Sequence, residues 1–412
     1  MEFQKELTER FLRYVKIDTQ SQDGQDMTPS TKKQHDLARV LYGELKEIGA
    51  RDVYYDKKNC YVYGRIPASK GATNKKILGL IAHMDTSDAV SGKDVKPRIV
   101  KKYDGRDIVL NKTQNVVLSP KVFPELKNHK GEDLIVTDGT TLLGADDKAG
   151  VAEIMTLLDV LIKNPKLPHP EIAVCFPPDE EIGHGAALID RKRMKADYAY
   201  TLDAGGLGEL EFECFNAASC RVHVRGRSVH PGTAKGMMLN ASLVAYEFHA
   251  MLPVFENPMY TEGREGFYHL THIEGSCEDA DADYILRDHD QKKNEERKKR
   301  MKEVADFLNK KYGKDTVTLT FKDSYQNMYD GIRAHFHLVT NARKAMKSLG
   351  ITPKEDPIRG GTDGARLTER GLPCPNLFTG GYNFHSKYEY ASVQEMVRAV
   401  EVLVTIAKLY VG

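Results

Sequence analysis

Two adjacent glutamates, Glu180 and Glu181, follow the apolar run 172–176 after a short turn. The run reads as a buried strand, and neighbouring carboxylates at its end repel each other without improving its packing. A nearby cation would replace that repulsion with attraction. The pattern therefore predicts a cation beside the two glutamates, and a metal ion is the favoured cation.

A second candidate strand, 77–82, leads into His83 and Asp85. Residues two positions apart on an extended segment leave the same face, so the imidazole and the carboxylate would lie together. A carboxylate beside a metal-bound imidazole fixes the tautomer of the ring and raises its basicity. Taken alone, such a pair is more often a core histidine followed by a turn aspartate.

Further polar residues follow other apolar segments. Asp146 and Asp147 precede a candidate helix, although one aspartate is enough to cap a helix. Asp203 ends the candidate strand 198–202, and His385 lies in a glycine-rich loop before the final helix. The glycine-rich turn before Asp146 lacks the Gly-Lys-Ser/Thr of a phosphate-binding loop, so phosphate binding is not predicted there.

One crevice could collect these side chains, because the carboxyl ends of the strands in an open α/β sheet converge. The crevice would hold two imidazoles and three carboxylates, namely His83, Asp146, Glu181, Asp203 and His385. This ligand set, without a thiolate, suits two zinc ions that share one carboxylate, with cobalt or manganese as substitutes. Two such ions activate water for attack on a carbonyl, so the predicted chemistry is hydrolysis.

The elements that must position these residues fall into two patterns. Strands alternate with amphipathic helices through 1–215 and again through 325–412, which predicts one discontinuous α/β catalytic domain. Its sheet is expected to be mixed and largely parallel, with helices on both faces. Segment 216–324 has the order βαββαβ, which predicts an inserted ferredoxin-like α+β domain. Its charged helix, 291–312, is expected to turn Lys298-Lys299-Arg300 to solvent.

The composition narrows the classes of partner. The chain has 412 residues and a formal net charge of +1, so it offers no global field for nucleic acid or for an anionic membrane. No apolar run approaches the roughly 20 residues of a membrane span, and the first residues lack the pattern of a signal peptide. The six cysteines include no Cys-x-x-Cys pair. We expect a reduced, soluble, cytoplasmic protein.

The motifs together resemble those of the cocatalytic zinc exopeptidases related to carboxypeptidase G. The motifs are His83-Met84-Asp85-Thr86, Gly144-Ala145-Asp146-Asp147-Lys148, Asp179-Glu180-Glu181, Leu202-Asp203-Ala204-Gly205-Gly206 and the late His385. Within that family, the segments 14–21, 228–236 and 359–364 make the chain most similar to the tripeptide aminopeptidases. The similarity covers essentially the whole chain and implies a zinc-exopeptidase catalytic domain with an inserted lid domain.

The resemblance implies two Zn²⁺ per subunit, bridged by Asp146. His83 and Asp203 would complete one metal site, and Glu181 and His385 would complete the other.

The resemblance also implies that Glu180 is the general base and that Asp85 is the carboxylate behind His83. Position supports this division of roles, because neighbours on an extended segment point apart. Glu181 can then bind metal while Glu180 faces the attacking water.

Three residues are candidates for substrate contacts by the same resemblance. His230 would contact the substrate carbonyl, and Arg287 would hold a substrate carboxylate, for which a guanidinium fork is suited. Arg359 is a third candidate. The lid domain could also pair two chains as a homodimer, and the resemblance does not decide whether His230 serves its own chain or a partner.

The implied activity is hydrolysis of the first peptide bond of tripeptides. A related N-acyl-amino-acid amidohydrolase or a carboxypeptidase would have nearly the same metal site. A non-catalytic metal-binding homologue is a more distant alternative.

Overall fold

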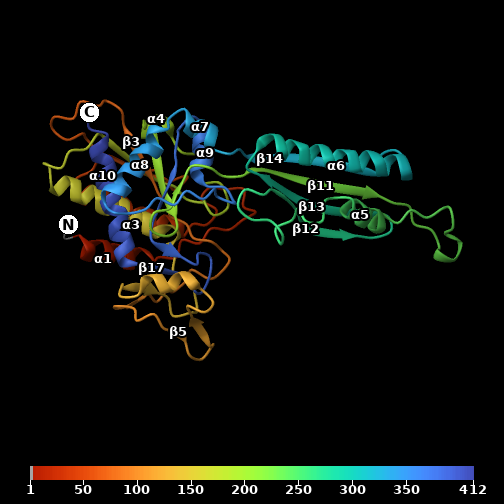
Figure 1. Cartoon of the computed structure of the whole chain (residues 1–412), viewed down its shortest axis with the longest axis horizontal. Helices are drawn as coiled ribbons and strands as arrows, with labels where there is room; N and C mark the ends of the chain where they lie inside the picture. Colours follow the sequence, from red (N-terminus) through yellow and green to blue (C-terminus); the bar gives the residue numbers. More distant parts are fainter. Residues whose placement is uncertain (1–2) are drawn as a thin grey trace. The chain divides into compact units, whose positions relative to one another are not determined.

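The computed structural model describes residues 3–412, and these form two units (Figure 1). Within the described residues, unit 1 comprises 3–212, Gly331–Asp356 and Thr362–Gly412, and unit 2 comprises Glu213–Asp330 and Pro357–Gly361. These divisions differ by a few residues from the boundaries at 215 and 325 that were expected from the sequence.

The segment Pro357–Gly361, which was expected in the catalytic domain, belongs to unit 2. The reason lies in its contacts: Ile358 forms a bridge with Cys214, and the Arg359 guanidinium donates to the carbonyl oxygens of Gly263 and Glu265, each at 2.9 Å.

The main sheet of unit 1 has seven strands in the order β1-β2-β8-β3-β9-β15-β10. Their bounds are β1 (Arg51–Tyr55), β2 (Val62–Ile66), β8 (Ile172–Phe176), β3 (Leu78–Ile81), β9 (Tyr198–Ala204), β15 (Asn376–Phe378) and β10 (Leu210–Glu211). The four strands from β8 to β15 are parallel to one another, and the outer pairs are antiparallel. β3 and β8 are buried along their whole length, because both faces of a parallel sheet are covered.

Helices cover both faces of this sheet, which confirms the predicted fold class. One face carries α2 (Gln34–Glu47), α3 (Ala145–Lys163), α8 (His337–Ser348) and α10 (Val393–Leu409), and α1 (Gln4–Tyr14) packs on α3 and α10. The other face carries the short helices α4 (Arg191–Met194) and α9 (Asp363–Glu369). Alternate residues of β9 show the two faces: the Tyr200 hydroxyl donates to the Leu338 carbonyl at 2.7 Å, whereas Ala199 packs with Met194 and Leu367.

A smaller sheet of unit 1 carries the chain around His385. Its order is β16 (Gly381–Tyr382), β17 (Tyr390–Ser392), β7 (Leu134–Val136) and β4 (Arg98–Val100). The hairpin β5 (Ile108–Asn111) and β6 (Val116–Leu118) and the 3-10 helix η1 (Pro124–His129) pack near it, and Figure 1 shows this part at the bottom of unit 1. The short helix α7 (Tyr329–Arg333) lies where the chain leaves unit 2.

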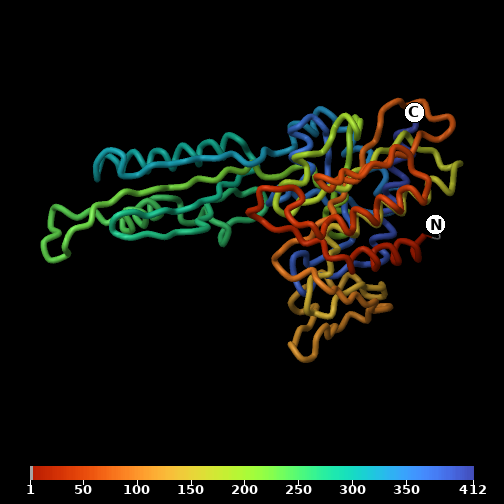
Figure 2. Tube along the Cα trace, turned by 180° about the vertical axis from the view of Figure 1, so that it is seen from behind, coloured from red at the N-terminus to blue at the C-terminus, as the bar shows by residue number. Residues whose placement is uncertain are grey.

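Unit 2 has the predicted ferredoxin-like order of elements. These are β11 (Asn216–Arg225), η2 (Pro231–Thr233), α5 (Ala241–Ala250), β12 (Phe267–Gly275), β13 (Asp279–Asp288), α6 (Gln291–Tyr312) and β14 (Val317–Tyr325). The four strands form an antiparallel sheet in the order β12-β13-β11-β14, and both helices pack on one face of it. Helix α6 extends beside the sheet, along the direction of the strands (Figures 1 and 2).

One expectation about α6 is wrong. Lys298 does not face solvent: it is 7% exposed, and its Nζ lies 2.7 Å from Glu295 and 2.5 Å from Asp323. The reason is helical spacing, because Lys298 lies on the same side as the buried Met301, three residues later. Lys299 and Arg300 are exposed as expected.

Two further observations concern the chain as a whole. Within residues 3–412, no helix is both long and apolar enough to span a bilayer. All six cysteines are free thiols.

Candidate metal centre

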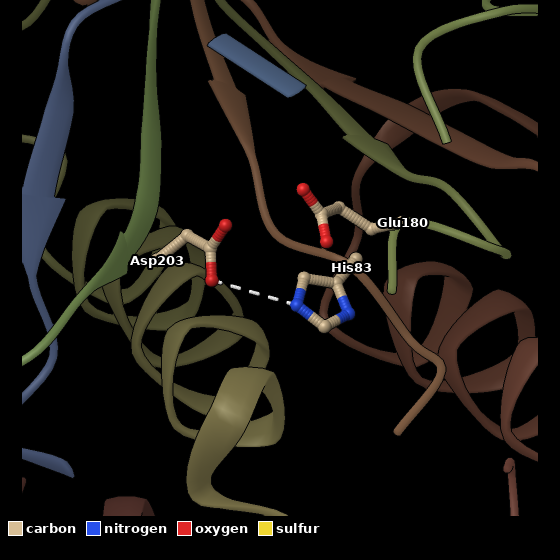
Figure 3. A group of neighbouring side chains, drawn as sticks. All are labelled: His83, Glu180 and Asp203. Carbon is tan, nitrogen blue, oxygen red and sulfur yellow. Dashed lines mark ion pairs between the residues drawn. The ribbon is translucent and has the colours of Figure 1, made fainter. Parts of the chain in front are cut away.

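His83 follows the end of β3 and lies among carboxylates from other strand ends. It is 3% exposed, and its Nε2 atom lies 2.9 Å from Asp146 Oδ1 and 3.4 Å from Asp203 Oδ1. Figure 3 shows a ring nitrogen of His83 facing Asp203, with the Glu180 carboxylate also close to the ring. The expected convergence of strand ends thus occurs around this imidazole.

His385 approaches the same aspartate from a separate loop. Its Nε2 atom lies 3.0 Å from Asp146 Oδ2 and 2.8 Å from Glu181 Oε2. The two oxygens of Asp146 therefore face two different imidazoles. This is the arrangement that a carboxylate bridge between two metal ions requires.

The donor set fits a pair of divalent cations. At this site, two groups have ligand atoms within 4.8 Å of one another, namely His83, Glu180 and Asp203, and His83, Asp146 and Glu181. Glu181 Oε1 is buried and has no hydrogen-bond partner among the described residues. Imidazole and carboxylate ligands without sulfur suit zinc, manganese or cobalt.

The electrostatics of the cluster also favour a bound cation. Burial, followed by the nearby Asp146, raises the pKa of Glu181 to about 8, and burial raises the pKa of Asp203 to about 6. Hydrogen bonds to Asp146 and Glu181 raise the pKa of His385 to about 11. The carboxylates thus favour positive charge at the imidazole, and a metal ion would supply this charge when it replaces the ring proton.

Asp85 contacts both the histidine and the glutamate pair. Its side chain is fully buried, with Oδ1 3.3 Å from His83 Nδ1. The same carboxylate accepts the backbone N–H of Glu180 at 3.0 Å and that of Glu181 at 3.2 Å. The second pair of contacts was not foreseen from the sequence, and it fixes the backbone from which both glutamates project.

Asp146 and Asp147 have different contacts. Both have non-helical backbone angles, so the regular part of α3 begins after them. Asp147 Oδ1 accepts the Gly150 N–H at 3.2 Å, as a helix cap does, and its Oδ2 accepts the His83 N–H at 3.1 Å. Capping by Asp147 leaves the carboxylate of Asp146 free to face the two imidazoles.

Gly150 allows α3 to lie close to the end of β9. A Cβ atom on Gly150 would lie 2.1 Å from the carbonyl oxygen of Leu202, which is the residue before Asp203. Only glycine fits there, so this position controls how closely the Asp146 turn approaches Asp203.

Comparison with known proteins identifies the family. A model of the peptidase family M20/M25/M40 matches residues 135–409. The chain belongs to this family. Peptidase T of Alkaliphilus oremlandii (strain OhILAs) is 54% identical over 408 residues, which cover 98% of this chain and 99% of that protein. Peptidase T of Bacillus subtilis (strain 168) is 50% identical over 98% of each chain. The predicted resemblance to tripeptide aminopeptidases is thereby confirmed.

Solved structures agree with the M20 fold. The aminopeptidase PepT from Bacillus cereus ATCC 10987 superposes with a TM-score of 0.79 at 25% identity, over 99% of each chain. A dinuclear metal-binding M20 peptidase from Bacillus subtilis superposes with a TM-score of 0.64 at 13% identity, over 99% of this chain and 98% of that chain. Since the second identity is low, that likeness supports the fold alone.

The M20 chain carries two of its predicted substrate contacts at opposite ends of unit 2. Arg287 pairs with Ala217 at one end of β11, whereas His230 follows Arg225 at the other end. Eight residues of strand separate these ends, which is roughly 26 Å. One small substrate therefore cannot contact both side chains of the same chain.

The local contacts of these two residues differ as well. His230 is exposed, and its Nδ1 accepts the Gly232 N–H at 3.2 Å. Arg287 is half-buried, and its Nη1 donates to the carbonyl oxygens of Ala218 and Leu286 at 3.1 and 2.9 Å.

Arg359, the third predicted substrate contact, forms hydrogen bonds to a loop of unit 2. Besides its bonds to Gly263 and Glu265, its Nη2 donates to Thr261 Oγ1 at 2.9 Å, and the guanidinium lies over the ring of Phe215. These contacts use both Nη atoms, which favours a structural role over the substrate contact expected from the sequence.

Asp363 contacts Glu180, the predicted base, and the sequence did not indicate this contact. Its backbone N–H donates to Glu180 Oε1 at 3.2 Å, while its own Oδ1 accepts the Ala186 N–H at 2.7 Å. It lies in the segment 359–364, where Arg359 alone was expected to make a contact at the site.

Proposed function

We propose that this M20 peptidase is a metal-dependent aminopeptidase that removes the amino-terminal residue of tripeptides. The arrangement of Asp146, with one oxygen toward His83 and the other toward His385, carries the proposal because it places a shared ligand between two metal sites. Similarity over 98% of the chain to proteins named peptidase T supports the choice of substrate.

The metal ligands proposed are the five residues predicted from the sequence. Asp146 would bridge, with His83 and Asp203 on one ion and Glu181 and His385 on the other. We propose zinc, with cobalt or manganese as substitutes. When bound, the ions supply Lewis-acid activation of a water and of the scissile carbonyl.

Glu180 is the proposed general base. Burial, followed by the neighbouring Asp203, raises the pKa of Glu180 well above the ordinary value for a glutamate. A carboxylate with a raised pKa can take the proton of the attacking water and hold it until it passes to the nitrogen of the leaving amine. The Asp363 N–H orients this carboxylate through Oε1.

The proposed substrate and the bond that is cleaved are tested by identifying the products. We expect an unblocked tripeptide to release its first residue and leave a dipeptide, while the acetylated tripeptide stays intact. Cleavage of the acetyl group would indicate an N-acyl-amino-acid amidohydrolase, and release of the last residue would indicate a carboxypeptidase. A metal-loaded protein that cleaves none of these peptides would support the non-catalytic alternative.

We also propose that two chains pair through unit 2 and that the protein is cytoplasmic. Within residues 3–412, eight of the fourteen exposed large apolar side chains belong to unit 2, and such surfaces often mark protein contacts. They are Met237, Leu243, Tyr246, Val254, Phe255, Met259, Tyr260 and Phe307.

The proposed cytoplasmic location rests on the six free cysteines, which are typical of a reducing compartment.

A further inference from the structure

Glu389 is a buried carboxylate outside the proposed ligand set, four residues after His385. Its side chain is 1% exposed. Its Oε2 accepts the backbone N–H of Leu143 at 2.7 Å and of Gly144 at 2.8 Å, and its Oε1 accepts that of Asp146 at 3.1 Å. One side chain therefore satisfies three donors of the turn that carries Asp146.

These donors have no local acceptor side chain. The turn precedes the regular part of α3, where backbone N–H groups lack partners within the helix and favour a negative charge. Asp147 caps Gly150, and both oxygens of Asp146 face imidazoles. Glu389, which lies 243 residues from Asp146 in sequence, supplies the missing acceptor.

Glu389 and His385 belong to one hydrogen-bonded loop. The Glu389 N–H donates to the carbonyl oxygen of Ser386 at 3.4 Å, Ser386 Oγ donates to that of Asn383 at 2.6 Å, and Asn383 Nδ2 donates to that of Tyr388 at 3.2 Å. The loop is thus braced internally. A displacement of Glu389 would move His385 relative to the Asp146 turn.

We propose that Glu389 is a positioning residue that sets the separation between the Asp146 carboxylate and the His385 imidazole. The inference rests on the metal centre proposed above. Two ligands held at the correct distance before the ion arrives bind it more tightly than two ligands on independent loops.

The test measures zinc affinity rather than activity. Zn²⁺ is titrated against a competing chelator for the unsubstituted protein, for Glu389→Gln and for Glu153→Gln. The amide in Glu389→Gln would direct an N–H₂ group at backbone N–H donors, so we expect zinc affinity to fall about 10- to 100-fold. Glu153 is the matched control, because it is fully buried on α3 and neither of its oxygens has a hydrogen-bond partner in residues 3–412. We expect Glu153→Gln to keep the original affinity.

A second variant separates the effect of geometry from that of charge, and melting temperatures show whether the variants are folded. Glu389→Asp keeps the buried charge but is one methylene too short to reach all three donors, so an intermediate loss of affinity is expected. Melting temperatures are measured with and without zinc. A merely structural role would lower both equally, whereas a positioning role reduces the increase that zinc produces.

Unchanged zinc affinity in both Glu389 variants would overturn the inference while leaving the metal centre intact. An affinity restored in full by Glu389→Asp would also overturn it, since charge alone would then suffice. If the unsubstituted protein bound no zinc, the metal centre itself would be wrong, and this inference with it.

Discussion

Two pairs of identical neighbouring acids in this chain make different contacts. Asp146 faces two imidazoles while Asp147 caps a helix, and Glu181 contacts His385 while Glu180 accepts the Asp363 N–H. The backbone directs adjacent side chains to different neighbours, so each pair can supply one ligand and one residue with another task.

The glutamate pair gives a direct prediction. Glu180→Gln should retain metal but lose about 10²- to 10⁴-fold in turnover, because the amide cannot accept the proton of the attacking water. Glu181→Gln is the matched control and should instead weaken metal binding. Turnover is measured on a tripeptide and metal content by elemental analysis. Full activity in Glu180→Gln would exclude this residue as the base.

At the scale of elements, a buried ion network joins three helices of unit 1. Arg10 on α1 lies 2.6 Å from Glu44 on α2 and 2.9 Å from Asp159 on α3, and all three side chains are nearly buried. The Tyr14 hydroxyl donates to Glu44 at 2.5 Å. A buried network of this kind stabilises the folded state only while every charge has its partner.

Removal of the central cation should therefore destabilise unit 1. We expect Arg10→Met to lower the free energy of unfolding by about 1.5–3 kcal/mol. Glu44 and Asp159 each lose one cationic partner, although Arg13 still contacts Glu44 and Lys163 still contacts Asp159. Arg39→Met is the matched control, because Arg39 pairs with Asp36 on the surface and should cost at most about 1 kcal/mol. Denaturant unfolding measures both. Equal stability of the two variants would contradict the role given to Arg10.

The same network predicts loss of stability in acid. Although burial opposes it, hydrogen bonds from Tyr14 and Arg10 lower the pKa of Glu44 below its ordinary value of 4.5. A lowered pKa in the folded state means that Glu44 stabilises the protein above pH 4.5 and that this stabilisation is lost as the pH falls below it. The melting temperature of the unsubstituted protein should therefore fall below pH 4.5, and the fall should be smaller in Glu44→Gln. An equally steep fall in that variant would assign the acid sensitivity to other groups.

For the whole molecule, the separation of Arg287 and His230 within unit 2 has a consequence for assembly. One substrate cannot contact both residues of one chain, so if both act, one of them serves the site of another chain. The apolar surface of unit 2 is consistent with such pairing.

Mixing of inactive variants tests this arrangement. Glu180→Gln is combined with His230→Ala, and separately with Arg287→Ala, under conditions that exchange subunits. We expect only one of the two mixtures to regain activity, because only the residue that acts across the interface can be supplied by the partner. Light scattering provides the oligomeric state. Restoration in both mixtures, or in neither despite dimer formation, would contradict the expectation.

Residue types and their order were enough to predict the fold class and the chemistry. Strand ends that carry His83, Asp203 and Glu181 predict a metal site with N and O ligands, because the preference of a side chain for a metal is a property of the side chain itself. The alternation of strands and helices likewise indicates an α/β domain, since hydrophobic periodicity is local.

Only the tertiary structure decided which atom faces which partner. The cap of α3 by Asp147, the carboxylate of Glu389 behind the Asp146 turn, the burial of Lys298 and the opposite placement of Arg287 and His230 all depend on contacts that sequence spacing does not reveal. The physical reason is that these contacts join segments far apart in the chain or depend on the register of packed elements. The sequence by itself therefore determined the ligands available, and the fold decided how they are divided and held.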